Sequence, residues 1–173
     1  MSDALEYQQD GTLLWANFAN DQLNGETRIE ENGRLLAVLR YQQGVLNGMM
    51  ERWHPNGQLA MQQAYREGRP DGIARYFSEN GELLREEQWL NGLLHGECRS
   101  FYPSGQVQLR EQWCQGLRHQ LSEQFYPDGS LAQRLCYEKG ILKGEAERWL
   151  PDGRAIDARG KAQSRMSKWT ERL

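Results

Sequence analysis

The chain has 173 residues, and its 21 Lys and Arg against 24 Asp and Glu give a formal net charge of −3. Because the basic residues are spread along the chain, there is no basic footprint for nucleic acid, and no apolar run approaches the roughly 18 residues of a membrane span. Only 38% of the residues are hydrophobic, whereas 18 are Gly and 10% are aromatic. This composition favours a thin fold with many turns and aromatic contacts over a thick aliphatic core.

The first residues and the cysteines bear on the compartment in which the protein resides. The start of the chain, MSDALE, lacks the basic and then apolar pattern of a signal peptide. Cys98, Cys114 and Cys136 cannot all pair with one another and do not have the spacing of zinc ligands. We therefore expect reduced, packed cysteines in a cytoplasmic protein, and export by a route without a cleavable signal stays open.

Turn dipeptides recur every 24 residues, so the chain is a tandem repeat. After an irregular first copy at Asp10-Gly11, they stand at Asn32-Gly33, Asn56-Gly57, Asn80-Gly81, Ser104-Gly105, Asp128-Gly129 and Asp152-Gly153. A second glycine series, most members of which open a G-x-x-x-G pattern, interleaves with them at Gly44, Gly68, Gly92, Gly116 and Gly140. Gln120 stands where a closing glycine is expected.

The turn residues predict the shape of each unit. In His54-Pro55-Asn56-Gly57, proline presets φ at the second position, Asn tolerates the third, and glycine takes a positive φ at little cost. This combination predicts a type I turn followed by a left-handed residue, which is the three-residue hairpin loop with a G1 bulge. Such a loop places a first-strand aromatic residue opposite a return-strand aliphatic residue, as in Phe77–Leu83, Phe101–Val107 and Phe125–Leu131.

We therefore predict an all-β fold. Residues 1–159 are expected to form about seven antiparallel β-hairpins in one elongated, meandering, single-layer sheet, because a lone hairpin is marginal and must stack on its neighbours. Residues 160–173 leave the repeat, and Met166, Trp169 and Leu173 follow a helical spacing. This tail is predicted to be a short amphipathic helix that caps the last hairpin and protects its edge.

Side-chain alternation along the strands predicts one aromatic face, which we interpret as the candidate partner-binding surface. It joins the aromatic residues of both strands to charged neighbours: Trp53, Tyr65, Phe77, Glu87, Trp89, Arg99, Phe101, Glu111, Trp113, Phe125, Tyr137 and Trp149. The opposite face is smaller and more polar, and Tyr76, Tyr102 and Tyr126 make it an alternative contact surface. The charged residues are equally explained as a ladder of solvated cross-strand ion pairs, each of little energetic value.

The sequence does not predict catalysis, a metal site or a cofactor. His95 and His119 hold equivalent places in adjacent repeats, so they are expected about two strand spacings, roughly 10 Å, apart, too far to share a zinc ion. With His54 they are interpreted as loop residues that bond to backbone. No Ser or Cys has a histidine and an acid placed around it by repeat position, and the glycines belong to hairpin turns rather than to a phosphate-binding loop.

The repeat resembles the MORN (membrane occupation and recognition nexus) repeats, in their bacterial variant. The resemblance rests on the x-Asn-Gly-x-Leu turns, on Tyr or Trp before x-x-Gly, and on closures such as Leu94-His95-Gly96. It runs from about Leu23 to Asp157 and more weakly back to Leu5. Many bacterial proteins of this kind are classed as antitoxins or immunity-like proteins, and other MORN proteins are membrane scaffolds. The resemblance therefore implies non-catalytic protein binding, with an antitoxin that occludes a toxin or effector as the leading specific expectation.

Two further functions stay open at this point. Membrane or phospholipid association is disfavoured by the net acidic charge and the absence of clustered Lys and Arg. A carbohydrate-binding surface would use the aromatic ladder, which is its only support. The identity of the partner, the face it contacts, and pairing of sheet edges into a dimer are all undecided by the sequence.

Overall fold

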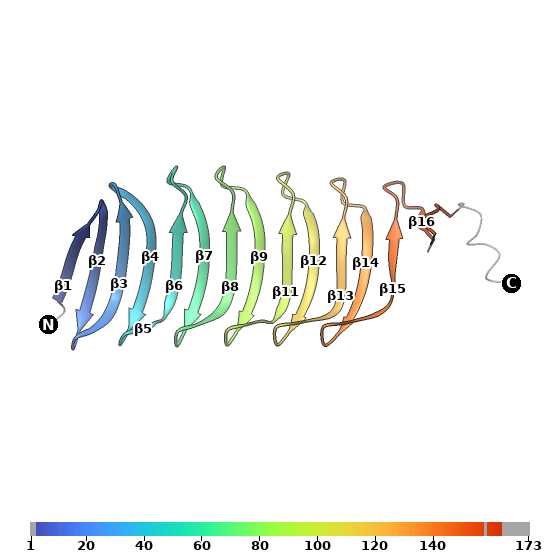
Figure 1. Ribbon diagram of the computed structural model, residues 1–173. Helices are drawn as coiled ribbons and strands as arrows, with labels where there is room; N and C mark the ends of the chain where they lie inside the picture. The colour runs from blue at the N-terminus through green and yellow to red at the C-terminus, as the bar shows by residue number, and fades with distance from the viewer. Residues whose placement is uncertain (1–2, 158, 164–173) are drawn as a thin grey trace. The chain divides into compact units, whose positions relative to one another are not determined.

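The structure is a computed structural model that describes residues 3–157 and 159–163 (Figure 1). It divides into two compact units, Met1–Leu94 (unit 1) and His95–Leu173 (unit 2). Every regular element in the described residues is a β-strand, so the predicted all-β class is confirmed. The described part of the chain contains no helix with the length and hydrophobicity needed to cross a membrane.

Unit 1 is an antiparallel meander in which strands that follow one another in the chain lie side by side. Its strands are β1 (Asp3–Gln9), β2 (Thr12–Ala19), β3 (Gln22–Glu31), β4 (Arg34–Gln42), β5 (Val45–Leu46), β6 (Gly48–Trp53), β7 (Leu59–Arg66), β8 (Arg69–Phe77), β9 (Leu83–Leu90) and β10 (Leu93–Leu94). The two-residue strands β5 and β10 pair with the ends of β4 and β9.

Unit 2 repeats this arrangement. Its strands are β11 (Gly96–Phe101), β12 (Val107–Cys114), β13 (Leu117–Phe125), β14 (Leu131–Glu138), β15 (Ile141–Trp149) and β16 (Ala155–Ile156). Each pairs antiparallel with the next. The predicted succession of β-hairpins is thus confirmed within each unit.

Two kinds of turn connect the strands, and they alternate from His54 to Gly153. At His54–Gly57 the Gly57 N–H donates to His54 O at 2.9 Å, and Gly57 has φ 85°, as expected for a type I turn with a G1 bulge. Gln43-Gly44 instead has positive φ at both residues, 50° and 76°, which defines a two-residue type I′ turn. Asn32-Gly33 also has positive φ at both residues and belongs to this second kind.

The type I′ turns are tied to one another by backbone hydrogen bonds. The N–H of Gly68 donates to Leu46 O, and that of Gly92 to Pro70 O, both at 2.8 Å. In unit 2 the Gly140 N–H donates to Arg118 O at the same distance. Each of these three glycines therefore satisfies a carbonyl group of the preceding hairpin, which helps to fix the stacking of consecutive hairpins.

The strand register contains an extra residue after each G1 turn. Phe77 pairs with Leu83 as predicted, but Tyr76 pairs with Arg85, so Leu84 has no partner in the ladder. The predicted pairs Phe101–Val107 and Phe125–Leu131 are likewise present and are followed by the same shift. Because side chains alternate along a strand, the extra residue moves the rest of the return strand to the other face of the sheet.

The two aromatic series therefore lie on opposite faces, and the prediction of one shared aromatic face is wrong. We call the side that carries the return-strand aromatic residues face A, and the side that carries the first-strand aromatic residues face B. Residues that pair across a ladder share a face, and side chains alternate along each strand. Trp89 pairs with Gly72, which is five residues from Phe77 on β8, so Trp89 lies on face A and Phe77 lies on face B. The prediction failed because it continued the alternation through the bulge.

Face A also holds the most buried side chains. In unit 1 a cross-strand row joins Gln63 to Ala74 and Ala74 to Glu87, and these residues are 2%, 0% and 7% exposed. In unit 2 the corresponding row joins Cys98, Glu111 and Ser122, all of them buried. Small residues alternate with longer polar ones along the row, so burial does not require a second layer of structure.

The predicted capping helix over 160–173 is not found where the structure describes this tail. Gly160 closes another turn, in which its N–H donates to Asp157 O at 2.9 Å. Ala162 then forms a β-bridge with Ile156, and the Gln163 N–H donates to Ala155 O. The bond between Gly160 and Asp157 is that of the turns that close the repeats, so no helix begins at Gly160. Met166, Trp169 and Leu173 lie outside the described residues.

Gln120→Gly is expected to stabilise the protein by about 0.5–1 kcal/mol. Gln120 is exposed and has φ 64°, a left-handed conformation that disfavours residues with a Cβ atom. Glycine removes this strain, which outweighs the larger entropy it gives the unfolded chain. Urea unfolding midpoints measure the effect, and the matched Gly144→Gln, at φ 71° with no atom crowding its Cβ, should destabilise. A lower midpoint for Gln120→Gly would contradict the prediction.

Candidate binding surfaces

Face A of unit 1 contains a carboxylate that organises three neighbouring side chains. Glu87 Oε2 accepts hydrogen bonds from the Tyr76 hydroxyl at 3.1 Å and from Trp89 Nε1 at 3.0 Å. Its other oxygen accepts one from Arg85 Nε at 2.6 Å. Burial, followed by the charge and hydrogen bond of Glu87, raises the pKa of Tyr76 to about 12. Glu87 therefore fixes the orientation of an aromatic pair, Tyr76 and Trp89, on an open sheet face.

Face A of unit 2 has the equivalent residues with a different arrangement. Arg118 lies over two rings, 5.6 Å from the centroid of Trp113 and 5.5 Å from that of Tyr137. Its Nε is 2.8 Å from Glu111 Oε1, but the N–H is not aligned with that oxygen, so the ion pair lacks a hydrogen bond. Trp113 Nε1 is buried and has no hydrogen-bond partner among the described residues. The guanidinium group, rather than the carboxylate, organises this cluster.

Face B of unit 2 carries a row of arginine side chains stacked on aromatic rings. Arg110 lies 5.4 Å from the centroid of Phe125, and Arg134 lies 5.6 Å from that of Trp149. Arg99 lies 5.6 Å from the centroid of Phe101. Each arginine lies on a strand next to its ring or on the same strand. The rings therefore present an ordered surface of alternating cationic and aromatic groups.

Glu123 lies between two of these arginines and is only 7% exposed. It accepts hydrogen bonds from Arg110 Nη2 at 2.7 Å and from Arg134 Nε at 3.0 Å. Burial alone would raise the pKa of Glu123, but the two hydrogen bonds and positive charges outweigh it and hold this pKa below its ordinary value. The carboxylate thereby keeps both guanidinium groups in place over their rings.

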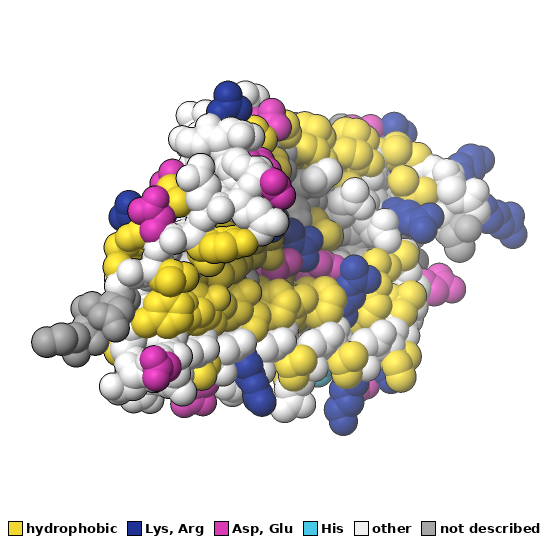
Figure 2. All heavy atoms as spheres, turned by 60° about the vertical axis from the view of Figure 1, so that its left-hand side comes forward, with side chains coloured by type: hydrophobic (Ala, Val, Ile, Leu, Met, Phe, Trp, Pro, Cys, Tyr) yellow, Lys and Arg dark blue, Asp and Glu magenta, His cyan; other side chains and the backbone are white. Residues whose placement is uncertain are grey.

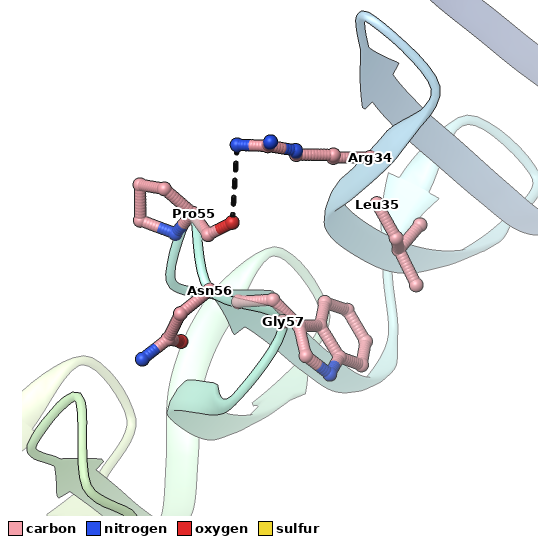
Figure 3. Close-up of a pocket in the computed structure, with 6 residues that line it drawn as sticks. Arg34, Leu35, Pro55, Asn56 and Gly57 are labelled. Carbon is pink, nitrogen blue, oxygen red and sulfur yellow. Dashed lines mark hydrogen bonds between the residues drawn. The ribbon is translucent and has the colours of Figure 1, made fainter.

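Face B of unit 1 is a ladder of ion pairs, as the structural interpretation of its charges predicted. Arg40 contacts Glu51 at 3.0 Å and Glu26 at 3.4 Å, and Arg75 contacts Glu86 at 2.8 Å. The ladder ends near the G1 turn in a shallow recess lined by Trp53 and Leu35. There Arg34 Nη1 donates to Pro55 O at 3.4 Å across neighbouring hairpins (Figure 3).

Tyr102 and Tyr126 hold the turns together. The Tyr102 hydroxyl donates to Phe125 O at 2.8 Å, and the Tyr126 hydroxyl donates to Trp149 O at 2.9 Å. His54 Nε2 makes the same contact with Phe77 O at 2.9 Å. All three side chains therefore link one hairpin to the next. Tyr76 instead joins Trp89 through Glu87 on face A of unit 1.

The structure divides the predicted binding residues into two sets. Face A holds Tyr65, Glu87, Trp89, Glu111, Trp113 and Tyr137, and face B holds Trp53, Phe77, Arg99, Phe101, Phe125 and Trp149. The sequence prediction missed Arg110, Arg118 and Arg134, which stack on these rings. Arg110 and Arg134 stand 24 residues apart, so the repeat period is the signal that could have found them. A role for either set in partner binding stays a prediction.

Within the described residues, no three or more His, Cys, Asp and Glu side chains are grouped so that they could hold a metal ion. In Figure 2, hydrophobic side chains gather in rows, and charged side chains lie between the rows. Large aromatic rings beside charged groups held in place suit a surface that contacts another molecule.

Four segments of the chain match the family model described as the MORN repeat variant: 46–67, 70–91, 94–115 and 121–139. These segments cover 85 of the 173 residues and are similar to MORN-variant repeats. Each matched segment carries a return-strand aromatic residue, and the gap between the third and fourth segments contains Gln120. No curated protein is significantly similar to the chain. The similarity to the MORN repeat variant, together with the β-hairpin architecture, suggests a repeat-containing binding scaffold.

Tyr76 is expected to ionise at about pH 12. Because its pKa is raised in the folded state, its contribution to stability is complete below pH 10, the ordinary value, and is lost as the pH rises from 10 to about 12. The near-ultraviolet absorbance titration of the wild type minus that of Tyr76→Phe isolates this group. A difference curve centred near pH 10 would show that Glu87 does not hold the hydroxyl.

Glu123→Gln is expected to lower the free energy of unfolding at pH 7 by about 1–3 kcal/mol, because two charged hydrogen bonds lose their anion. The pKa of Glu123 is depressed in the folded state, so its stabilisation is present above the ordinary value of 4.5 and is lost as the pH falls through the folded pKa. The difference between wild type and variant should therefore shrink on acidification. Urea unfolding across pH 7 to 3 measures it, and a difference independent of pH would contradict this assignment.

Proposed function

We propose that the protein is a non-catalytic scaffold that binds a protein partner through the aromatic and arginine row of face B in unit 2. The observation that carries this proposal is the stacking of Arg99, Arg110 and Arg134 on three rings at the repeat spacing. Arginine and aromatic side chains are enriched among the residues that dominate binding energy in protein interfaces.

The state of these side chains before binding also supports the proposal. Glu123 holds Arg110 and Arg134 through hydrogen bonds of 2.7 and 3.0 Å. These hydrogen bonds already restrict the rotamers of both arginine side chains, so binding of a partner would cost less side-chain entropy than usual. Each of the two remains about two-fifths exposed, at 45% and 40%, and can contact a partner without rearrangement.

The more specific form of the proposal is an antitoxin or immunity-type protein that neutralises a toxin by covering its active surface. Its support is the resemblance of the repeats to those of such proteins, together with the shape of a single-layer sheet, which exposes a large area for its mass. A standard interface needs about 800 Å² per partner, which a few hairpins supply.

The test is capture of the partner by the tagged full chain, with two matched variants. Arg110→Ala removes a guanidinium group from face B and leaves Arg134 bonded to Glu123. Arg118→Ala removes one from face A of the same unit. If face B binds, Arg110→Ala should weaken the interaction at least about tenfold, the scale of a lost interface anchor, and Arg118→Ala should leave it nearly unchanged.

Both variants are first compared with the wild type by urea unfolding, so that a lost fold is not mistaken for a lost contact. The opposite pattern, loss with Arg118→Ala alone, would reject face B and favour face A. A captured protein that arrests growth when expressed without the scaffold, and not with it, would support the antitoxin form. Capture of a partner with no such effect would reject that form and leave the binding scaffold.

A further inference from the structure

Strand β1 is an open edge of the sheet in unit 1. The strand order of the described residues begins at β1, which pairs only with β2. The Asp10-Gly11 turn that follows it has φ 49° and 79°, as a two-residue type I′ turn requires. The flanking Gln9–Thr12 pair is then hydrogen-bonded, and alternation directs the N–H and C=O groups of Ala4, Glu6 and Gln8 away from β2.

This edge lacks several of the features that usually prevent strand addition. Its ladder with β2 runs without a register shift over seven pairs, from Asp3–Phe18 to Gln9–Thr12. The strand contains no proline, lysine or arginine, and Leu5 and Tyr7 on face A are 50% and 52% exposed. Edge strands in soluble proteins are normally protected by bulges, proline or inward-pointing charges.

Strand β15 of unit 2, which is only partly covered by its neighbour β16, shows the contrast. β16 covers its end by pairing with Arg148 and Trp149. The rest of the strand carries charged residues, Lys143 among them, and its ladder with β14 has a register shift. Of these features, β1 lacks the covering strand, the lysine and the register shift.

Charge identifies the kind of partner that fits β1. Residues 1–31 contain seven Asp and Glu against one basic residue, Arg28, a net charge of −6, whereas residues 32–94 contain seven of each sign and balance. Among the described acidic residues up to Glu31, Glu26 alone forms ion pairs, and its partners are Arg28 and Arg40. In Figure 2, which turns the β1 end forward, Asp and Glu side chains are spread over this end. Such a field attracts a cationic segment and repels a second copy of the same edge.

A recess beside the edge offers a place for one basic side chain. On face B it is lined by Glu6, Leu13, Trp15, Arg28 and Glu30. Arg28 already stacks 5.9 Å from the Trp15 centroid, so the ring accepts a cation. A residue added opposite Glu6 would fall on this face, whereas residues opposite Leu5 and Tyr7 would fall on face A beside apolar side chains.

We propose that the outer edge of β1 takes up an extended segment of a protein partner as an added strand, and that this segment alternates apolar and basic residues. Backbone hydrogen bonds to Ala4, Glu6 and Gln8 would supply affinity, and the alternation would supply specificity. The basic side chain lies in the Glu6–Glu30 recess, and its neighbours contact Leu5 and Tyr7. This surface is separate from the face B row, so the two proposals stand or fall independently.

The test uses the full chain and a labelled peptide of alternating valine and lysine, with binding measured by fluorescence anisotropy. Gln8→Pro removes an outward N–H that β2 does not use, and proline is tolerated at that position of an edge strand. It should weaken binding about tenfold, because a backbone hydrogen bond is lost and the added strand is obstructed. Gln8→Ala is the matched control and should bind as the wild type does.

A double variant, Glu6→Gln/Glu30→Gln, should weaken binding and reduce its dependence on salt. Arg110→Ala should leave peptide binding unchanged, which separates this surface from face B. Circular dichroism and urea unfolding check that each variant is folded. Equal binding of a valine–glutamate peptide, wild-type binding by Gln8→Pro, or no binding of the lysine peptide would each overturn the proposal. A concentration-dependent dimer abolished by Gln8→Pro would also overturn it, by assigning the edge to a second copy.

Discussion

The extra residue after each G1 turn determines which side chains can act together. Without it, Trp89 and Phe77 would share one face, and the opposite face would be smaller and more polar. With it, Tyr76 pairs with Arg85 rather than with Leu84, and the side chains of the rest of the return strand lie on the other face of the sheet. Glu87 is thereby brought between Tyr76 and Trp89, where it accepts hydrogen bonds from both. Both sides of a thin sheet consequently carry aromatic rings with ordered polar partners, and neither side is a purely polar surface.

The same register explains how a chain with so few aliphatic residues maintains a fixed structure. Ala74 and Cys98 are buried beside longer polar side chains rather than under a second layer. Consecutive hairpins are joined at their turns by hydrogen bonds that repeat along the chain, such as Tyr102 to Phe125 O and Tyr126 to Trp149 O. Each link contributes little alone, but every repeat is held by its neighbours, as in other repeat proteins whose stability is a sum of adjacent interfaces.

Much of the fold follows from the sequence because the determining signals are local. Pro55-Asn56-Gly57 specifies its turn through backbone sterics, and the turn specifies the Phe77–Leu83 type of pair. The shift at Leu84 has no such signal, since no glycine or proline marks it, and it arises from fitting a twisted return strand to its neighbour. The division of the aromatic residues between two faces was therefore beyond prediction. The helix predicted over 160–173 is not found in the described part of the tail, where Asp157 and Gly160 form another copy of the repeat's turn.

The distribution of paired and unpaired charges separates affinity from specificity. On face B, Glu123 already binds Arg110 and Arg134, so a partner's charged groups would compete with ion pairs that exist before binding. Burial of the rings and guanidinium groups of that surface would contribute to affinity, but the surface would discriminate only weakly between partners of different charge. Near β1, Glu6 and Glu30 belong to a segment with a net charge of −6, and among its acidic side chains that the structure describes, Glu26 alone forms ion pairs. There a basic segment would gain electrostatic energy that an acidic one would lose, so this end of the sheet is where the scaffold can select among partners.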